Sequence, residues 1–541
     1  MNKQENGRDR QCGVRLLIRD ISLPYTASAK EALSRADKKL RAAGIRAESL
    51  SIFKRSVDAR RKNDIRFLYS VCACCEKTPS ADVLLKIPAG ILAAPEKTPI
   101  GGNEDLSGRV IVVGFGPCGM FAALELAKAG YRPLVLERGA EVRERKRQVD
   151  LFLKTGVLDV NSNVQFGAGG AGTFSDGKLV TRINDPLGST VFETLFEFGA
   201  PESIMTLAKP HVGTDKLLFV VENADKKIKE LGGEILYETK LLSLKRRADG
   251  SLLSVITDKG EIPCGALVLA VGHSARDTYE MLLEEGFSVS PKDFSVGARV
   301  EHLQEDIDRA LYGDGDVAVL GHGEYSLSYR EGQRGVYSFC MCPGGQVVCA
   351  SSEQGGLVVN GMSNYARDGK NANAAIAVSV LKEDYGATPK KAIAYQRTLE
   401  QRAFEAAGGG YRAPVQLLGD FLAGGHGSTP QRITPTFRDG AHHTLCDLAD
   451  ILPPHVTAMM RRGFPYFDKK IKGYAVKDAV LTGVETRTSA PVRIVRNEDL
   501  TAIGCPNLYP AGEGAGYAGG ITSAAVDGLR VAREVIRRYK A

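Results

Sequence analysis

The stretch from Arg109 to Gly130, RVIVVGFGPCGMFAALELAKAG, decides the fold of this 541-residue chain. It begins with a run of Val and Ile that is typical of a buried strand, and it ends with an apolar pattern of helical length. Between them stands the turn G-F-G-P-C-G, which has the spacing G-x-G-x-x-G. A strand, a glycine turn and a helix in this order predict an α/β domain that binds the pyrophosphate of a dinucleotide.

The residues of this turn have separate roles. Gly114 ends the strand and permits a tight turn, Gly116 lets the backbone approach a pyrophosphate, and Gly119 lets the helix pack closely on the sheet. Pro117 suits the first helical turn, where its missing N–H costs nothing. The helix N-terminus then offers free N–H groups and the positive end of its dipole to the phosphates.

The next predicted strand, R-P-L-V-L-E, ends at Glu137, eighteen residues after Gly119. A carboxylate at this place can accept hydrogen bonds from both ribose hydroxyls of an adenosine, whereas it would repel a 2′-phosphate. We therefore expect a cofactor other than NADP. Glu137 and the neighbouring Arg138 are predicted to bind it.

The C-terminal segment decides between NAD and FAD, which share this first half. The sequence NLYPAGEGAGYAGGITS, which starts at Asn507, predicts a short strand, a Gly-Glu turn and a final helix. It resembles glutathione reductase-like flavoproteins, in which a similar turn places an acid on the ribityl chain. A helix N-terminus stabilises the negative charge of reduced flavin, so we predict FAD. The residues of this segment that we predict to bind FAD are Gly512, Glu513, Gly519, Gly520 and Ile521. We add Gly272, which ends the apolar strand LVLAVG.

A second G-x-G-x-x-G, at Gly167, Gly169 and Gly172, lacks this context, because it follows NVQF and no amphipathic helix comes after it. We interpret it as a loop whose glycines let the backbone run beside the flavin. A loop packed only on protein is the alternative. The residues predicted to bind the cofactor here are Gly169, Gly170, Gly172 and Thr173.

The order of elements predicts an α/β protein. We expect a discontinuous, glutathione reductase-like FAD-binding Rossmann domain with an inserted α+β substrate domain and a small N-terminal β-α-β-β domain. The expected ranges are 1–85 for the small basic domain, 86–107 for a linker, 108–284 for the first part of the FAD-binding domain, 285–484 for the inserted domain and 485–541 for the second part.

Several motifs resemble those of a bacterial family known only as FAD-dependent dehydrogenases. They include NVQFGAGGAGTFSDGKLVTR, KPHVGTDKL, FSVGARVEH, VVNGMSNYARDGKNANAA and DAVLTGVETRTSAPVRI, in addition to the C-terminal glycine segment. The resemblance covers essentially all of residues 105 to 541. It implies FAD and two-electron redox chemistry with a small organic substrate, and it brings no substrate identity.

Candidates for the face opposite the flavin are Asp176 and Lys178, which follow the glycine loop, and Arg487 and Thr488 in GVETRTS. Arg487 could pair with an anionic substrate or with the reduced ring; a salt bridge that fixes a loop is an equal alternative. The catalytic residues themselves stay unknown.

The cysteines and histidines give weaker signals. Cys340 and Cys342, at positions i and i+2 of a predicted strand, could form a redox pair, although core packing is the commoner role. Cys72 and Cys75 lack a second pair at metal-ligand spacing. Because the eleven cysteines are scattered over a long chain, we expect reduced thiols. His211, His302 and His322 have no partner spacing that identifies a base or a metal site, so no metal is predicted.

Charge and composition set the remaining expectations. The first 100 residues carry 20 Lys and Arg against 11 Asp and Glu, a net charge of +9, while the whole chain carries +7. Such a charge run is usually a solvated face. The alternative is RNA binding by the N-terminal domain, and with it an RNA-modifying flavoenzyme. A non-catalytic flavin protein is a third alternative. Without an apolar leader or span we expect a cytoplasmic protein. NAD(P)H is a candidate transient electron donor, and the oligomeric state stays open.

Overall fold

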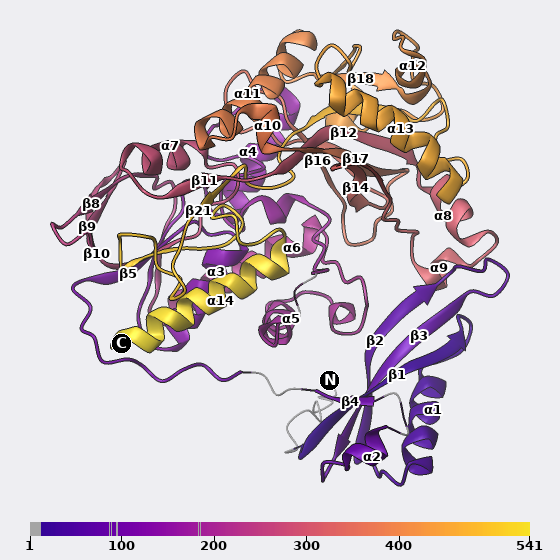
Figure 1. Cartoon of the computed structure of the whole chain (residues 1–541), viewed down its shortest axis with the longest axis horizontal. Coiled ribbons are helices and arrows are strands. Elements are labelled where there is room, and N and C mark those ends of the chain that lie inside the picture. Colours follow the sequence, from indigo (N-terminus) through magenta and orange to yellow (C-terminus); the bar gives the residue numbers. More distant parts are fainter. Residues whose placement is uncertain (1–11, 86, 88, 93–95, 182, 184) are drawn as a thin grey trace.

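The computed structural model describes residues 12–541 apart from 86, 88, 93–95, 182 and 184. The expectation that the chain has no apolar leader rests partly on residues 1–11, which lie outside this range. Figure 1 shows three bodies: a small N-terminal unit at the lower right, an α/β unit that carries the final helix, and an upper unit whose sequence is inserted within that of the α/β unit.

The N-terminal unit is an antiparallel sheet covered by one helix. Its elements are β1 (Val14–Pro24), α1 (Ala29–Ala42), β2 (Ser49–Asp58), β3 (Arg66–Cys75), α2 (Ala81–Leu84) and β4 (Ala89–Ile91), and the strand order is β2-β3-β1-β4. Ala32, Ala36 and Leu40 of α1 are buried against the sheet. Ser28 and Glu31 form a capping box at the start of α1. The expected β-α-β-β order is therefore present.

The fourth strand corrects the expected linker. Residues 89–91, which we assigned to the linker 86–107, pair with β1, so that Leu16 lies opposite Ile91 and Ile18 opposite Ala89. The reason is that this edge of β1 offers unpaired N–H and C=O groups that a short strand can satisfy. The N-terminal sheet thus extends past residue 85, and β4 was too short to predict from periodicity.

The α/β unit contains a parallel sheet of the Rossmann type. The parallel strands, from one edge to the other, are β7 (Glu234–Leu236), β6 (Leu134–Leu136), β5 (Arg109–Val113), β10 (Gly260–Leu269) and β22 (Leu508–Pro510). The first half of β10 also pairs with β9 (Leu252–Thr257), which pairs with β8 (Leu241–Arg246). The last parallel strand comes from the end of the chain, more than 200 residues after its neighbour. The sheet is therefore assembled from two separate segments.

The helices of this unit are α3 (Pro117–Lys128), α4 (Val142–Thr155), α5 (Leu187–Glu197), α6 (Thr214–Glu230), α7 (Arg276–Glu284) and α14 (Ile521–Arg538), with the 3₁₀ turns η1 (Ala171–Phe174) and η2 (Glu202–Met205). Helices α3, α6, α7 and α14 pack on strands of the sheet, whereas α4 packs on α6 and α5 on α14.

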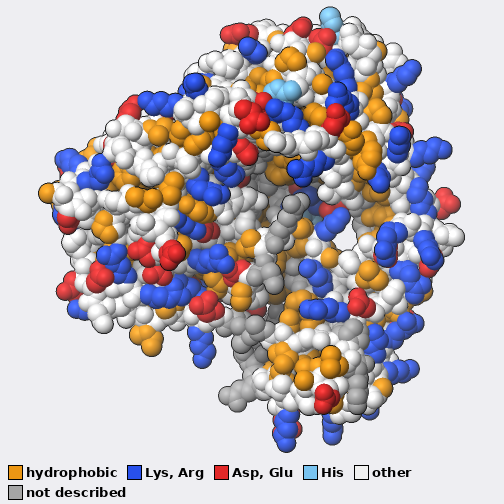
Figure 2. All heavy atoms as spheres, in the orientation of Figure 1, with side chains coloured by type: hydrophobic (Ala, Val, Ile, Leu, Met, Phe, Trp, Pro, Cys, Tyr) orange, Lys and Arg blue, Asp and Glu red, His pale blue; other side chains and the backbone are white. Residues whose placement is uncertain are grey.

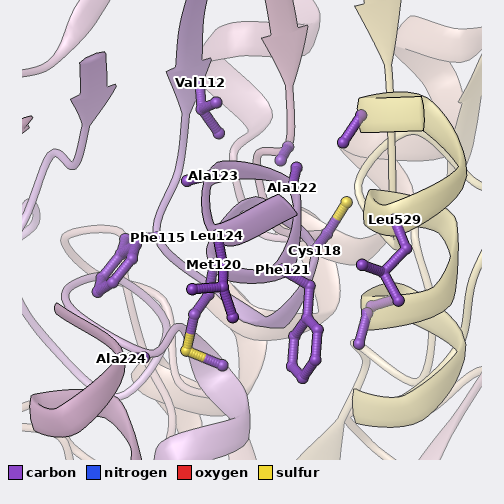
Figure 3. Packing of buried hydrophobic residues seen from close by; sticks show 14 of the residues in the cluster. Val112, Phe115, Cys118, Met120, Phe121, Ala122, Ala123, Leu124, Ala224 and Leu529 are labelled. Carbon is purple, nitrogen blue, oxygen red and sulfur yellow. The ribbon is translucent and has the colours of Figure 1, made fainter. Parts of the chain in front are cut away.

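Helices α3 and α14 lie side by side, and Figure 3 shows Cys118 and Phe121 of α3 facing Leu529 of α14. A Cβ on Gly528 would lie 2.2 Å from the carbonyl oxygen of Cys118, so this contact requires glycine. Within the same contact, buried Arg533 donates to Glu125 at 2.8 Å. The two segments are thus locked together by packing as well as by the sheet.

The upper unit is a mostly antiparallel sheet in the order β13-β14-β17-β12-β20-β18-β19. The strands are β12 (Phe294–Leu303), β13 (Ser328–Glu331), β14 (Arg334–Cys342), β17 (Asn371–Val380), β18 (Ala413–Leu417), β19 (His443–Leu445) and β20 (Val480–Glu485), and the hairpin β15 (Gln346–Cys349) and β16 (Val359–Met362) packs on them. The helices are α8 (Gln304–Tyr312), α9 (Val317–Leu320), α10 (Lys382–Tyr385), α11 (Pro389–Ala406), α12 (Leu418–Ala423) and α13 (Pro454–Lys470), with the 3₁₀ turn η3 (Phe437–Gly440).

Two connections join the upper unit to the α/β unit, and they pair with each other. The outgoing strand β11 (Val289–Pro291) runs antiparallel to the returning strand β21 (Val492–Ile494). The N-terminal unit joins the rest through backbone hydrogen bonds between Arg55 and both Thr206 and Ala208. Tyr312 and Leu320 of the upper unit also belong to its apolar core.

Two cysteines of the N-terminal unit are bonded to each other. Cys12 and Cys74 form a disulfide, so the expectation that all cysteines are thiols is wrong for this pair. The reason is that β1 and β3 pair with Val14 opposite Cys75, which brings two cysteines 62 residues apart into contact.

Among the described residues, no helix combines the length and the apolar character that crossing a bilayer requires.

Candidate flavin-binding site

A cavity of about 350 Å³ lies between the α/β unit and the upper unit. Its floor is at the carboxyl ends of the parallel strands, at Val113, Leu136 and Ala270, which is the usual place for ligands in open α/β sheets. Phe339 and Asn360 of the upper unit face it from the other side. Both units are therefore needed to enclose it.

Most of the residues predicted from the sequence line this cavity. Those at its wall are Gly114, Gly116, Pro117, Glu137, Arg138, Gly170, Gly172, Gly272, Glu513, Gly519, Gly520 and Ile521, together with Asp176, Lys178, Arg487 and Thr488. Gly119, Gly169, Thr173 and Gly512 are absent from the lining. The structure thus brings together segments that are up to 400 residues apart in sequence.

The first glycine turn has the close contacts that we expected. Gly114 has φ +97°, and a Cβ on it would lie 2.6 Å from the carbonyl oxygen of Ala270. A Cβ on Gly119 would lie 1.9 Å from the carbonyl oxygen of Gly114. Gly119 therefore acts behind the cavity, where it lets α3 approach β5, and any side chain there would push the helix away.

The second glycine stretch lies directly against this turn. Gly169 N–H donates to the Phe115 carbonyl at 2.8 Å, and a Cβ on Gly170 would lie 3.0 Å from the Cα of Gly116. The stretch forms a loop and the short turn η1 rather than a second nucleotide-binding unit. Thr173 lies behind it, where its hydroxyl oxygen is buried without a hydrogen-bond partner.

Arg145 of α4, which sequence reasoning missed, holds this loop from behind. Its guanidinium is fully buried and donates to the carbonyl oxygens of Asn163, Val164, Gly167, Ala168 and Gly170 at 2.6 to 3.2 Å. Burial lowers the pKa of Arg145 to about 9. One arginine in a polar helix carries no sequence signal of such a role.

The carboxylate of Glu137 is engaged mainly with the backbone. It accepts hydrogen bonds from the N–H groups of Phe115, Gly139 and Gly167 at 2.8 to 3.0 Å. Two carboxylate oxygens have about four acceptor positions, so about one remains for a ribose hydroxyl. Glu137 thus ties the two glycine stretches together at the cavity wall.

Two helix N-termini face the cavity, and neither carries a side-chain cap. Helix α3 begins after Gly116 with Pro117 in its first turn, and α14 begins after Gly520. A Cβ on Gly272, Gly519 or Gly520 would meet nothing within 4 Å, so the cavity wall at these positions is bare backbone. The free N–H groups and the dipoles suit a pyrophosphate at α3 and a negatively charged ring at α14. These features fit FAD.

Glu513 is half-buried at the cavity wall. Burial raises the pKa of Glu513 to about 7, while Lys292 and the N–H of Gly520 oppose this shift. Near neutral pH this group can therefore both donate and accept hydrogen bonds, as a partner of sugar-like hydroxyls must.

Asp176 and Lys178 belong to a buried ionic cluster at the edge of the cavity. Lys178 pairs with Asp176, and Arg367 donates to both Asp176 oxygens at 2.9 and 2.5 Å and to Glu324 at 2.6 Å. Burial would raise the pKa of Asp176, but Lys178 and Arg367 hold it below its ordinary value. The cluster keeps the Lys178 ammonium charged at the cavity wall.

Arg487 and Thr488 are committed to structural contacts. Arg487 donates to both oxygens of Glu400 at 3.0 and 2.7 Å. The Thr488 hydroxyl bonds the backbone N–H and C=O of Ser295 at 3.2 and 2.9 Å. These contacts are the salt-bridge alternative that we weighed for Arg487, and they fix the returning chain to the outgoing one.

His273, which sequence reasoning did not single out, lines the cavity beside Gly272. Its Nδ1 lies 3.0 Å from the Ser274 hydroxyl, which donates to Gln165 at 3.1 Å. Burial, with Arg487 and Arg276 nearby, lowers the pKa of His273 to about 3. The ring is therefore neutral at physiological pH, and a single histidine after an apolar strand gave no usable signal.

The other sequence candidates lie elsewhere. His211 contacts the carbonyl of Tyr365 at 3.0 Å, His302 that of Tyr474 at 2.7 Å, and His322 the carboxylate of Asp308 at 2.8 Å. Within the described ranges, no three His, Cys, Asp or Glu side chains are grouped to hold a metal ion. Figure 2 shows Lys and Arg side chains along the edge of the N-terminal unit, away from the cavity.

Comparisons with known proteins identify the class. Residues 293–488 match a family described as FAD-dependent protein, C-terminal domain-like. An uncharacterized protein of Clostridium beijerinckii is 48% identical over 498 residues, which are 91% of this chain and 92% of that protein. A 12-dehydrotetracycline 5-monooxygenase/anhydrotetracycline 6-monooxygenase of Streptomyces rimosus is 30% identical over 162 residues, 29% of each protein.

Among solved structures, L-proline dehydrogenase from P. horikoshii is 15% identical with a TM-score of 0.33, over 79% of this chain and 93% of that one. Such a TM-score is too low to define the fold, which the strand order defines instead.

The Rossmann-type sheet, the cavity at its carboxyl edge and the matched family define an FAD-dependent flavoenzyme. The chain belongs to the same family as the Clostridium beijerinckii protein, with which it shares nearly its whole length. The prediction of an FAD-dependent family from the sequence motifs is thereby confirmed.

Proposed function

We propose that the protein transfers two electrons between FAD and a small organic substrate that binds in the cavity between the α/β unit and the upper unit. The observation that carries this proposal is the composition of the cavity wall. Backbone groups suited to FAD lie on one side, and Phe339, Cys340 and Asn360 of the upper unit lie on the other. The upper unit then acts as the substrate domain.

In this proposal the α/β unit holds the cofactor. The α3 N-terminus and the turn Gly114–Gly116 would hold the pyrophosphate, Glu137 a ribose hydroxyl, and Glu513 the ribityl chain. The α14 N-terminus would face the ring. When bound, FAD supplies hydride and electron chemistry, while the protein supplies binding, orientation and charge.

The remaining wall residues would act on the substrate side. Lys178, held charged by Asp176, offers a cation to an anionic substrate group. Neutral His273 offers one donor or one acceptor. The ion pairs of Arg276 of α7 with Glu400 and Glu353 of the upper unit would keep the two units closed on each other, which would exclude water from the cavity.

The direct test is flavin content. The purified protein is expected to be yellow and to release FAD on acid denaturation, and apoprotein is expected to rebind FAD with an affinity that Glu137→Gln weakens. A control variant, Glu405→Gln on the exposed face of α11, should rebind FAD normally. Wild-type protein that loses its flavin under gentle conditions and does not rebind added FAD would refute the proposal.

The electron donor is tested anaerobically. Holoprotein is mixed with NADH and then with NADPH while the flavin absorbance is followed. Rapid bleaching by either compound assigns the protein as a reductase that takes electrons transiently from a nicotinamide. Without bleaching, the organic substrate is the donor, and metabolite pools are screened for the compound that bleaches the protein.

A further inference from the structure

Two cysteines of the upper unit lie at an irregular point of strand β14, next to the cavity. In the pairing of β14 with β17, Phe339 lies opposite Ala375 and Cys342 opposite Asn373, so one extra residue is present between them. Cys340, within this bulge, has φ +44°. A non-glycine residue in the left-handed region is uncommon, and bulges re-aim side chains beside active sites.

The bulge carries Cys340 to the cavity wall. Cys340 lines the cavity and is partly exposed, whereas Cys342 is fully buried behind it. In an extended strand the Cα atoms of residues i and i+2 are about 6.6 Å apart, at the upper end of the span that a disulfide bridges. The bend that a bulge introduces favours a shorter span. The two cysteine side chains therefore lie close together within the bulge.

Arg299 of β12 fixes this unit. Its guanidinium is fully buried and donates to the Cys340 carbonyl at 3.0 Å, with the Cys342 sulfur at 3.9 Å. It is held by Glu485 at 2.7 and 3.2 Å, and it also donates to the side-chain oxygens of Asn373 and Asn360. A permanent cation thus stands beside the Cys342 sulfur and the Cys340 backbone, in a position that its other partners determine.

The two thiols differ in acidity. The Cys342 thiol, whose S–H donates to the Cys340 carbonyl oxygen at 3.3 Å, and the cations Arg299 and Lys178 lower the pKa of Cys340 below the ordinary value of a thiol, against the effects of burial and of Glu485. The neighbouring Cys340, burial and the charge of Asp176 raise the pKa of Cys342. The carboxyl group of Glu513 faces Cys340 across the cavity. One thiol is therefore reactive and accessible, and its partner is positioned to resolve a bond formed on it.

The cysteines that serve packing look different. Cys118, Cys264 and Cys349 are buried in apolar clusters, and burial raises their thiol pKa values. Of these, Cys349 is the best comparison, because it lies in the adjacent hairpin strand β15, seven residues after Cys342.

We propose that Cys340 and Cys342 form a redox-active pair that faces the flavin cavity and cycles between a dithiol and a disulfide. On oxidation two S–H bonds break and one S–S bond forms. The two electrons and two protons pass to an oxidised flavin, and on reduction both return from a small-molecule dithiol or thiol pair. The assignment of the flavin as internal partner rests on the proposed function, whereas the thiol chemistry itself does not.

The test uses full-length apoprotein and holoprotein, equilibrated in glutathione buffers of increasing reduction potential. Each sample is quenched with acid, alkylated and digested with trypsin. The peptide Gly335–Arg367, which contains Cys340, Cys342 and Cys349, is then measured by mass. The expected result is loss of two hydrogens at oxidising potentials, with alkylation blocked at Cys340 and Cys342 and retained at Cys349.

Variants distinguish a resolving pair from two independent thiols. Cys342→Ser is expected to trap glutathione on Cys340, and Cys340→Ser to abolish oxidation of the peptide. Cys349→Ser, the matched control, should leave the two-hydrogen loss unchanged. In wild-type apoprotein the alkylation rate of Cys340 should rise at a lower pH than that of Cys349, because the pKa of Cys340 is lowered and that of Cys349 is raised.

A second measurement connects the pair to the flavin. Anaerobic dithionite titration of oxidised holoprotein should consume about two electron equivalents per FAD more than either serine variant, because one disulfide takes two electrons and the Cys12–Cys74 disulfide is common to all three proteins. A peptide that stays fully alkylated in the most oxidising buffer overturns the proposal while leaving FAD binding intact. A protein that cycles its thiols but binds no FAD instead refutes the proposed function.

Discussion

Glu400 of α11 accepts two hydrogen bonds from Arg276 of α7, at 2.6 and 2.8 Å, across the junction between the α/β unit and the upper unit. Arg487, on the returning chain, reaches the same carboxylate. All three side chains are buried. Three segments that are far apart in sequence thus share one carboxylate, next to the cavity wall that Arg487 lines.

Glu400→Gln is expected to destabilise the protein strongly. Removing one partner of a buried ion pair leaves uncompensated charge and costs about 3–5 kcal/mol, here on two arginines. Urea unfolding measures the change. The control is Glu405→Gln on the exposed face of the same helix, for which a change below about 1 kcal/mol is expected. Equal stability of the two variants would contradict the role given to this junction.

Gly519→Ala is expected to weaken FAD binding by at least about tenfold, which corresponds to about 1.4 kcal/mol. The reason is that its Cβ would meet no protein atom within 4 Å and would project from the cavity wall at the start of α14. Titration of apoprotein with FAD gives the affinity, and thermal unfolding should give an unchanged melting temperature. Gly425→Ala also has free space for its Cβ but lies outside the cavity lining, so it should change neither quantity.

Arg145→Ala is expected to release the second glycine loop, because five carbonyl groups lose their shared donor. Each buried acceptor left unpaired costs about 1–3 kcal/mol before relaxation. Limited proteolysis should cut the loop between residues 163 and 178, and FAD affinity should fall. Arg143→Ala, on the exposed face of the same helix, removes an exposed ion pair with Glu222 and should leave both properties unchanged.

The sequence predicted the parts of the site that depend on local pattern. The strand, turn and helix around Gly114 and Gly116 follow from residue type and spacing alone, and so does the helix that begins after Gly520. The glycine stretch at Gly170 could be interpreted as a loop because it failed the context test for a second nucleotide-binding unit; its place beside a flavin stays a prediction. Each of these signals lies within about twenty residues of chain.

The parts that could not be predicted depend on tertiary contacts. Arg145, His273 and the junction of Arg276 with Glu400 are single polar residues whose partners lie far away in sequence. Strand β4 has three residues, fewer than an alternation pattern needs, and it exists because β1 has a free edge. Arg487 illustrates the limit: the sequence indicated a cation near the cavity, but only the fold shows that its partner is Glu400.

Glu513 should make the stability of the apoprotein fall as the pH rises toward neutrality. Burial raises its pKa from 4.5 to about 7 in the folded state, so between these values the folded chain holds a proton that the unfolded chain has released. Unfolding stability therefore decreases with pH in this window, by about 3 kcal/mol if the pKa difference is fully expressed. The pH dependence contributed by Glu400 has the opposite sign. Arg276 and Arg487 outweigh burial and keep the pKa of Glu400 far below its ordinary value, so its contribution to stability is lost only as the pH falls below about 4.5.

Urea unfolding of wild-type apoprotein and of Glu513→Gln at pH 5, 6, 7 and 8 separates the two effects. The difference in unfolding free energy between the two proteins should change steadily from pH 5 to 7 and then level off, because the variant has no carboxyl group to ionise at position 513. The contribution of Glu400 is constant over this range in both proteins. A difference that does not vary with pH would show that the pKa of Glu513 is not raised in the folded protein. It would also contradict the proposal that a protonated Glu513 carboxyl group donates a hydrogen bond to a bound ribityl chain.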